Sequence, residues 1–132
     1  MEVRRAVLGD DGGSVEMRID PAGYVDLESW TRICVWDEAC TLEISDEVHL
    51  KSPAVALFRF HLGQPSAIES RQARTIGVKC GNASISIEAS RPITAELTEW
   101  PGPSDRIGNH QCLVIRTEEN VGDLSLTCRV AG

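Results

Sequence analysis

The sequence predicts an all-β fold, an antiparallel sandwich of roughly ten strands. Apolar and polar residues alternate with a period of two along most of the chain, which is the spacing of strands with one buried face. Short clusters of Gly, Pro and Asn separate the alternating segments, as turns do in sandwiches. Hydrophobic residues make up 42% and charged residues 25% of the chain, which excludes a disordered or fibrous protein.

Each strand follows from its own alternation. The clearest is 83–90, where Ile85, Ile87 and Ala89 alternate with serines and a glutamate. Along 53–62, every second position from Ala54 to Leu62 is apolar, so we expect one continuous strand there. The predicted strands are 2–8, 14–20, 30–36, 41–46, 53–62, 73–80, 83–90, 93–100, 110–117 and 123–130.

Turn residues mark the connections between these strands. Cys80-Gly81-Asn82-Ala83 predicts a two-residue hairpin whose central pair tolerates positive φ. Segment 66–74 is open to two interpretations. Ser66 and Glu69 have the spacing of a helix capping box, but too few apolar residues follow for a helix face, so we favour a short strand or a loop.

The length of 132 residues suits a single domain, 1–132. The longest unbroken apolar run is five residues, from Ala54 to Phe58, so we expect no membrane span and no membrane partner. The apolar stretch near the N-terminus is too short for a signal peptide. We therefore favour a cytoplasmic protein, or else a fragment whose leader lies elsewhere.

The charge of the chain is negative but uneven. The net charge is −7, which repels nucleic acids and other polyanions at long range, and we expect no nucleic-acid partner. Residues 53–91 are the exception, with five basic and two acidic side chains and a net charge of +3. This third of the chain is the one candidate for an anion-facing surface, although scattered solvated charges are the commoner arrangement.

Three residues are candidates for substrate binding: Arg59, His61 and Trp100. Arg59 and His61 share a strand face in the basic third, where an imidazole beside a guanidinium could contact a carboxylate. The alternative for His61 is a partly buried polar residue on a sheet face. Trp100 precedes Pro101-Gly102-Pro103 and could stack on a sugar ring or plug the edge of the core. We interpret His110, which opens a strand near a loop, as exposed.

Metal and cofactor motifs are not found in the sequence. The five cysteines form no CxxC pair, which leaves zinc-ribbon and thioredoxin interpretations without support. We expect reduced thiols, with a Cys34–Cys40 bridge as the main exception to test. The loop at Asp10-Asp11-Gly12-Gly13 lacks the fuller calcium-loop pattern and is better explained as an acidic turn. We predict no cofactor, no metal and no catalytic residue in this chain.

The segments follow one another in a recognisable order. Asp20-Pro21-Ala22-Gly23-Tyr24 precedes Trp30-Thr31-Arg32-Ile33, and Leu42-Glu43-Ile44-Ser45-Asp46-Glu47 and Leu57-Phe58-Arg59-Phe60-His61-Leu62 come next. Two alternating strands flank Gly81, and two strands close the chain after the loop from Trp100 to Gly108. Over nearly its whole length, the chain resembles the C-terminal β-sandwich of heparinase II/III-like polysaccharide lyases.

The resemblance implies a larger enzyme in which an N-terminal α/α-toroid precedes a large sandwich. Such bacterial enzymes cleave uronic-acid polysaccharides, including glycosaminoglycans, by β-elimination with Tyr and His side chains. No position here matches those catalytic motifs. The resemblance therefore implies a non-catalytic domain whose partners are the toroid of the same enzyme and, through the full-length protein, an acidic polysaccharide.

Two other functions compete with this hypothesis. An autonomous carbohydrate-binding module would need exposed aromatic side chains on one face, with Trp100 as the best candidate. A structural or protein-interaction sandwich of immunoglobulin type ranks lower, because no Cys pair flanks a Trp at the required spacing. A domain removed from upstream strands would also leave an unpaired sheet edge, through which a homo-oligomer could form.

Overall fold

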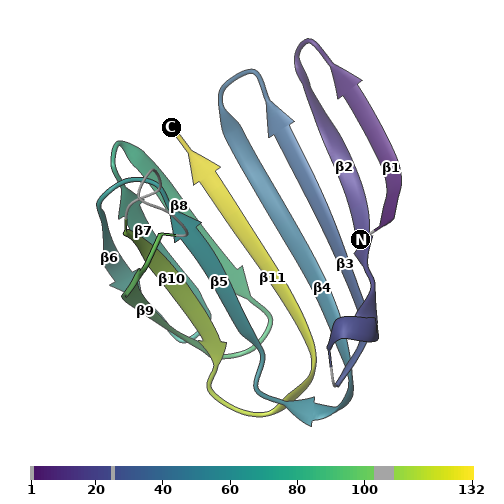
Figure 1. Cartoon of the computed structure of the whole chain (residues 1–132). Coiled ribbons are helices and arrows are strands. Elements are labelled where there is room, and N and C mark those ends of the chain that lie inside the picture. Colours follow the sequence, from purple (N-terminus) through teal and green to yellow (C-terminus); the bar gives the residue numbers. More distant parts are fainter. Residues whose placement is uncertain (1, 25, 103–108) are drawn as a thin grey trace.

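The computed structural model describes residues 2–24, 26–102 and 109–132. Eleven strands in this part of the chain form two antiparallel sheets, which confirms the predicted all-β sandwich (Figure 1). The larger sheet has the order β1 (Glu2–Gly9), β2 (Gly12–Ile19), β3 (Leu27–Asp37), β4 (Thr41–Ala54), β11 (Val121–Ala131), β8 (Ala83–Ala89), β7 (Thr75–Cys80) and β6 (Ser66–Arg71). The smaller has the order β5 (Leu57–Leu62), β10 (His110–Thr117) and β9 (Ile93–Trp100).

The core lies between the small sheet and the half of the large sheet that it covers. Ile87 on β8, Leu113 on β10 and Leu126 on β11 lie at the centre of this contact and are 0–1% exposed. Strand alternation directs these side chains inward and their neighbours outward, so each strand adds every second residue to the core. The other core residues are Leu27, Val48, Phe58, Leu62, Ile76, Val78, Ile85, Ala89, Ile93, Ala95, Ile115, Val121, Leu124 and Cys128.

The chain crosses from the large to the small sheet within the segment 53–62. We predicted one strand there, and this prediction is wrong. β4 continues through Ala54 and β5 begins at Leu57, in the other sheet. Buried Thr117 fixes the crossing, because its Oγ1 accepts a hydrogen bond from the Ala56 N–H at 3.0 Å and its own N–H donates to the Ala56 carbonyl. The apolar and polar residues keep alternating with a period of two across this crossing, so the sequence pattern does not show where the chain changes sheets.

Two local predictions are confirmed. The segment 66–71 is strand β6 and not a helix. The β7–β8 hairpin turns at Gly81 and Asn82, and Gly81 has a φ of 57°. A glycine at the first central position of a two-residue hairpin supplies this positive φ without steric cost.

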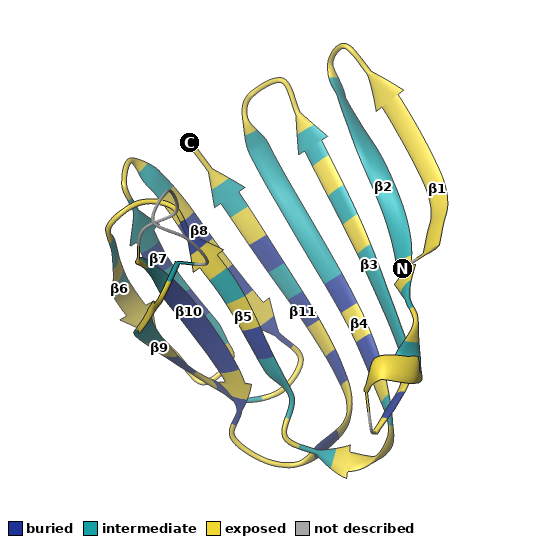
Figure 2. Ribbon diagram, in the orientation of Figure 1, coloured by how far each residue is buried: buried dark blue, intermediate teal, exposed yellow. Residues whose placement is uncertain are grey.

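The large sheet extends beyond the small one by β1, β2 and β3, which we call the wing (Figure 1). Figure 2 shows β1 exposed along its described length and β2 half-buried. Trp36 pairs across with Leu42 and with Gly13, on the sheet face that carries the core. A Cβ on Gly13 would lie 2.6 Å from the Trp36 indole, so the ring rests directly on the glycine.

A buried ion pair lies where the wing meets the covered half of the sheet. The Asp46 side chain is 1% exposed and accepts hydrogen bonds from Arg32 Nε at 2.7 Å and from Arg32 Nη2 at 3.0 Å. Trp30 Nε1 donates a third bond to the same carboxylate at 2.8 Å, and Trp30 also packs edge-on against Phe58. These bonds raise the pKa of Arg32, and they satisfy a carboxylate that is withdrawn from water.

Replacing Asp46 with Asn should cost about 3 kcal/mol of unfolding free energy, because the Arg32 guanidinium then loses its buried counter-charge. Urea denaturation followed by Trp fluorescence measures this loss. The control is Glu43→Gln, which removes the exposed ion pair with Arg129 and should leave stability nearly unchanged. Equal effects of the two substitutions would contradict the assigned role of Asp46.

Burial raises the pKa of the Cys128 thiol to about 11, and nearby Asp46 adds to the shift. In the unfolded chain this thiol ionises near its ordinary value of 9.0, so only the unfolded state releases the proton between these values. The contribution of the Cys128 thiol to the free energy of unfolding is complete below pH 9, and it declines as the pH rises toward 11. Compared with Cys128→Ala, the wild-type protein should lose stability across this window in denaturation curves at several pH values. Parallel pH profiles would be evidence against the shift.

Candidate functional site

The outer face of the small sheet gathers the three residues that the sequence singles out. Alternation directs Arg59 and His61 of β5 away from the core, because Phe58 and Leu62 on the same strand point into it. Trp100 ends β9, and the central strand β10 places His110 opposite Trp100. Four side chains from three strands thus meet at one end of this face, and we call them the outer-face cluster.

The four side chains contact one another in sequence. The Cζ atom of Arg59 lies 5.6 Å from the centre of the Trp100 ring, a cation–π distance. The rings of Trp100 and His61 meet edge to face with centroids 5.4 Å apart. His61 Nδ1 and His110 Nε2 are separated by 2.7 Å, which is a hydrogen bond between two imidazoles.

The cluster rests on a closely packed floor formed by the outward residues of β10. Cys112 is 0% exposed although it points away from the core, and it lies opposite His61 on one side and Thr98 on the other. Val114, opposite Arg59, is similarly buried. Burial raises the pKa of the Cys112 thiol, while the Arg59 charge acts in the opposite direction. The cluster therefore lies over two buried side chains of the central strand.

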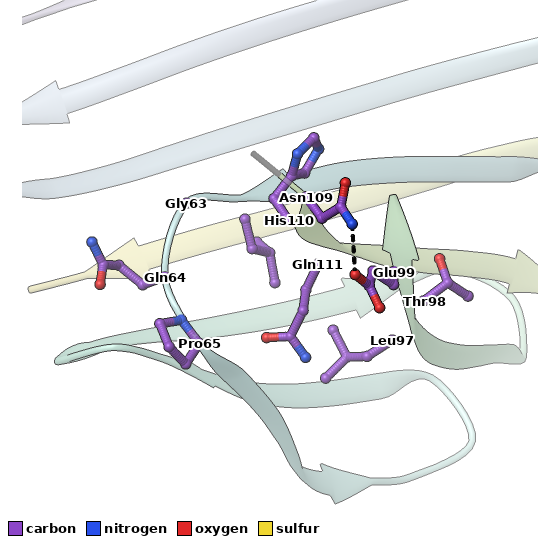
Figure 3. A pocket seen from close by; sticks show the side chains of 10 residues that line it. Gly63, Gln64, Pro65, Leu97, Thr98, Glu99, Asn109, His110 and Gln111 are labelled. Atoms are coloured by element: carbon purple, nitrogen blue, oxygen red, sulfur yellow. Dashed lines mark hydrogen bonds between the residues drawn. The ribbon is translucent and has the colours of Figure 1, made fainter. Parts of the chain in front are cut away.

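A hollow of about 380 Å³ adjoins the cluster at the same end of the sandwich (Figure 3). It lies between the turn at 63–65 and the ends of β9 and β10, and His110 contributes to its wall. Across its mouth Asn109 Nδ2 donates to Glu99 Oε1 at 3.0 Å. Below it, the Gln111 amide exchanges two hydrogen bonds with the Ser66 backbone, which ties β10 to β6. The lining is polar and apolar in about equal parts, with Leu62 and Leu97 among its apolar side chains.

The structure also shows what the sequence analysis missed. His110, which we interpreted as exposed, is half-buried and bonded to His61. The basic residues of the middle third do not form one surface, since Arg71 donates to the Ala95 carbonyl and Arg91 pairs with Asp123. The link between His61 and His110 depends on the β5–β10 register, and no local pattern in the sequence contains it.

The described residues hold a second hollow outside this site. This hollow of about 260 Å³ borders the core beside Tyr24, Trp30 and Phe58 and is mainly apolar. In the described ranges, no three His, Cys or acidic side chains are grouped to hold a metal ion. No helix within those ranges has the length and hydropathy needed to cross a bilayer. All five cysteines, Cys34 and Cys40 included, are free thiols.

Comparison with known proteins gives a likeness of fold. The sequence matches no protein-family model and no curated protein. The structure matches heparinase III, the BT4657 gene product, with a TM-score of 0.68 at 10% identity, over 98% of this chain and 20% of the other. Heparan sulfate lyase HepC from Pedobacter heparinus gives a TM-score of 0.68 at 10% identity, over 98% of this chain and 21% of that one. A structure of HI1317 gives 0.57 at 8% identity, over 98% of this chain and 64% of the other.

These matches confirm the predicted resemblance to heparinase-type lyases at the level of the fold. The chain spans about a fifth of the lyase chains that it matches. At identities near 10%, a shared fold does not carry residue roles from one protein to another.

The cover over Cys112 can be tested by thiol labelling. Trp100→Ala or His61→Ala should increase the rate at which Cys112 reacts with iodoacetamide, because His61 lies opposite the thiol, Trp100 packs on His61, and each substitution removes part of the lid above the thiol. Mass spectrometry of the digested protein resolves each cysteine, with exposed Cys40 as the internal standard. Arg116→Ala, on the same strand but next to Leu57 and Thr94, is the control and should leave the rate unchanged. An unchanged labelling rate in both test variants, as in the control, would show that other side chains cover Cys112.

Proposed function

We propose that this chain is a non-catalytic C-terminal β-sandwich domain of a heparinase II/III-like polysaccharide lyase. In this role it supports the toroid domain and the wall of the substrate cleft, while the full-length enzyme cleaves uronic-acid glycans by β-elimination. The likeness to heparinase III and to heparan sulfate lyase supports the proposal, since it extends over nearly all of this chain and only a fifth of theirs.

The observation that carries the proposal is the wing. On the face that continues the core, cross-strand pairs align apolar side chains from β1 to β4: Leu8, Val15, Met17, Cys34, Trp36, Leu42 and Ile44. Leu8 is 74% exposed, and Figure 1 shows no described strand over this face. A sheet with one apolar face is stable when a second layer covers it, and an apolar surface of this extent is typical of an interface.

The chemistry of the described side chains also favours a supporting role. β-Elimination needs a base, an acid and a group that neutralises the carboxylate, all held in one cleft. The two bonded histidines lie on an open sheet face, and Tyr24 lies near Trp30, on β3 of the other sheet. This arrangement does not bring a tyrosine and a histidine to one sugar ring.

A carbohydrate-binding module is the second candidate function. It is favoured by Trp100, which is 39% exposed beside Arg59 and His61 on the outer face. It is disfavoured because a module needs several exposed aromatic side chains on one face. Tyr24 is 52% exposed, but it belongs to a distant part of the fold and does not join Trp100. Loss of glycan binding in Trp100→Ala would support the module, and a glycan array without hits would exclude it.

The proposed role predicts no lyase turnover by the purified chain. Heparin, heparan sulfate and alginate should give no increase in the ultraviolet absorbance of the unsaturated product. Clear turnover by these 132 residues would overturn the non-catalytic assignment.

The wing predicts self-association of the isolated chain, through its apolar face or the unpaired edge of β1. Sedimentation velocity should show association that increases with concentration and decreases in Met17→Lys, which places a charge on the apolar face. Thr31→Lys adds the same charge to the opposite face of the wing, between Arg18 and Glu47, and is the matched control. A wild-type chain that remains monomeric and binds no hydrophobic dye would contradict an interface on this face.

A further inference from the structure

We propose that β5 is a docking edge: an amphipathic β-strand from the rest of the enzyme pairs antiparallel with β5 and extends the small sheet toward the wing. The proposal rests on the proposed function, because it names the kind of segment that begins the cover of the wing. Four features of the described residues support it: the backbone of β5, the limit of the small sheet's cover, the apolar hollow beside its edge and the charge of Arg59.

The backbone groups at the outer edge of β5 follow from one hydrogen bond. The Thr117 N–H donates to the Ala56 carbonyl, so these residues form a hydrogen-bonded pair in the register that joins β5 to β10. In an antiparallel ladder such pairs alternate with pairs whose N–H and C=O groups point away from each other. The residues with backbone groups directed away from β10 are therefore Leu57, Arg59 and His61.

This edge of β5 is open. Within the described ranges, β10 is the strand that pairs with β5, and β5 ends the order of the small sheet. At the opposite side of this sheet β9 adjoins β6, and Arg71 of β6 donates to the Ala95 carbonyl. Open edges of this kind accept a further strand, with affinity from main-chain bonds and specificity from alternate side chains.

The cover provided by the small sheet ends over the step from β11 to β4. Cys128 of β11 is 3% exposed, whereas Ile44, its partner on β4, is half-buried. β5 lies on this side of the small sheet, where Phe58 packs edge-on against Trp30 of β3. A strand paired with β5 would lie about 4.8 Å further along the small sheet and about 10 Å above the large one. It would therefore cover Ile44 and begin the layer that the wing lacks.

The second hollow lies beside the start of this edge. Its lining comes from both sheets, with Leu57 and Phe58 of β5 on one side and Trp30 of β3 and Val48 of β4 on the other. It has about 260 Å³ and is mainly apolar, so the side chains around it lack contacts on one side. Residues directly opposite in a strand pair project to the same face, so an apolar side chain opposite Phe58 would enter the hollow.

Arg59 sets a preference for charge on the outward side of the added strand. It forms no ion pair with any described residue. The residue opposite Arg59 would project to the same outer face, with the two Cβ atoms about 5 Å apart. An acidic side chain there would form a cross-strand pair with the guanidinium. The strand that fits is therefore apolar opposite Phe58 and Phe60 and acidic opposite Arg59.

The C-terminus offers a place to attach such a strand, because Gly132 lies at the end of the sandwich where β5 finishes. Ala131 pairs with Ser84 at the start of β8. The turn before β8 bonds to Pro65, just after β5, through the Gly81 N–H. A linker of about ten Gly and Ser residues after Gly132 has an end-to-end distance of roughly 17 Å. This suffices to cross one sheet spacing and two strand spacings.

The attached strand is Val-Thr-Ile-Glu-Leu-Thr, which in antiparallel pairing places its Glu opposite Arg59 and its Leu opposite Phe58. The control is Val-Pro-Ile-Glu-Leu-Pro, which keeps the apolar and charged side chains but lacks two of the N–H groups that would bond to β5. Hydrogen exchange followed by NMR reports on the edge amides of Leu57, Arg59 and His61. We expect the attached strand to slow their exchange by about tenfold or more, and the proline control to leave it unchanged.

Two results would overturn the pairing with β5: unchanged exchange at the three edge amides, or equal slowing by the proline control. Self-association that falls while these amides still exchange rapidly would mean that the wing is covered in another way. That result overturns the docking edge and leaves the proposed function intact. The core amides of Leu113 and Leu126 should exchange as slowly as in the unmodified chain, which shows that each variant is folded.

Exchange of charges tests the register. Arg59→Glu should weaken the protection given by the attached strand by about two- to fivefold, because two like charges then lie opposite each other. Lysine in place of the glutamate of the attached strand should restore the protection in this variant. Arg116→Glu makes the same change on β10, one strand further from the edge, and should have no effect. Equal weakening by both substitutions would show attraction by general charge and overturn the register.

Discussion

The packing of a narrow sheet against part of a wide one is the constraint on which this structure depends. Three strands cover only part of an eight-stranded sheet, and the fully buried residues such as Ile87, Leu113 and Leu126 come from the area of overlap. Burial of these side chains supplies the main driving force for folding. Because the overlap is partial, the same sheet contributes a closed core on one side and an uncovered apolar wing on the other.

Asp46 is located where the covered part of the sheet gives way to the wing. Its carboxylate binds Arg32 and Trp30 of β3, and Trp30 also packs on Phe58 of the small sheet. A charged group in this position requires full pairing, since an unpaired buried carboxylate is costly. The bidentate bond to Arg32 meets this requirement and joins β3 to β4 at one point of their register. The wing is thereby coupled to the core by side chains as well as by backbone hydrogen bonds.

The outer-face cluster is a second consequence of the narrow sheet. With three strands, β10 is the only central strand, and its outward residues Cys112 and Val114 are buried beneath side chains from both neighbours. The core and the cluster use alternate residues of the same strands, so the packing that orders the core also orders the cluster. A site on rigid strands is held more firmly than one on loops. The register of the three strands fixes the backbone positions from which the imidazole pair and the cation–π contact are made.

The sequence by itself determined the all-β class and the places of most strands, the tight turn at Gly81, the extended character of 66–71 and the resemblance to the lyase sandwich. All of these depend on local spacing or on the order of short segments, which a chain carries before it folds. Along 30–36, alternation places Ile33 and Val35 on one face of the strand and Trp30, Cys34 and Trp36 on the other. Which of these faces lies on the core side of the sheet follows only from the pairing of β3 with β4. The division into three and eight strands, the crossing at Ala56 and the contact of His61 with His110 were likewise decided by tertiary structure. The physical reason is that a period of two specifies two faces for every strand, whereas which face is buried and which strands are neighbours depend on partners far away in the chain.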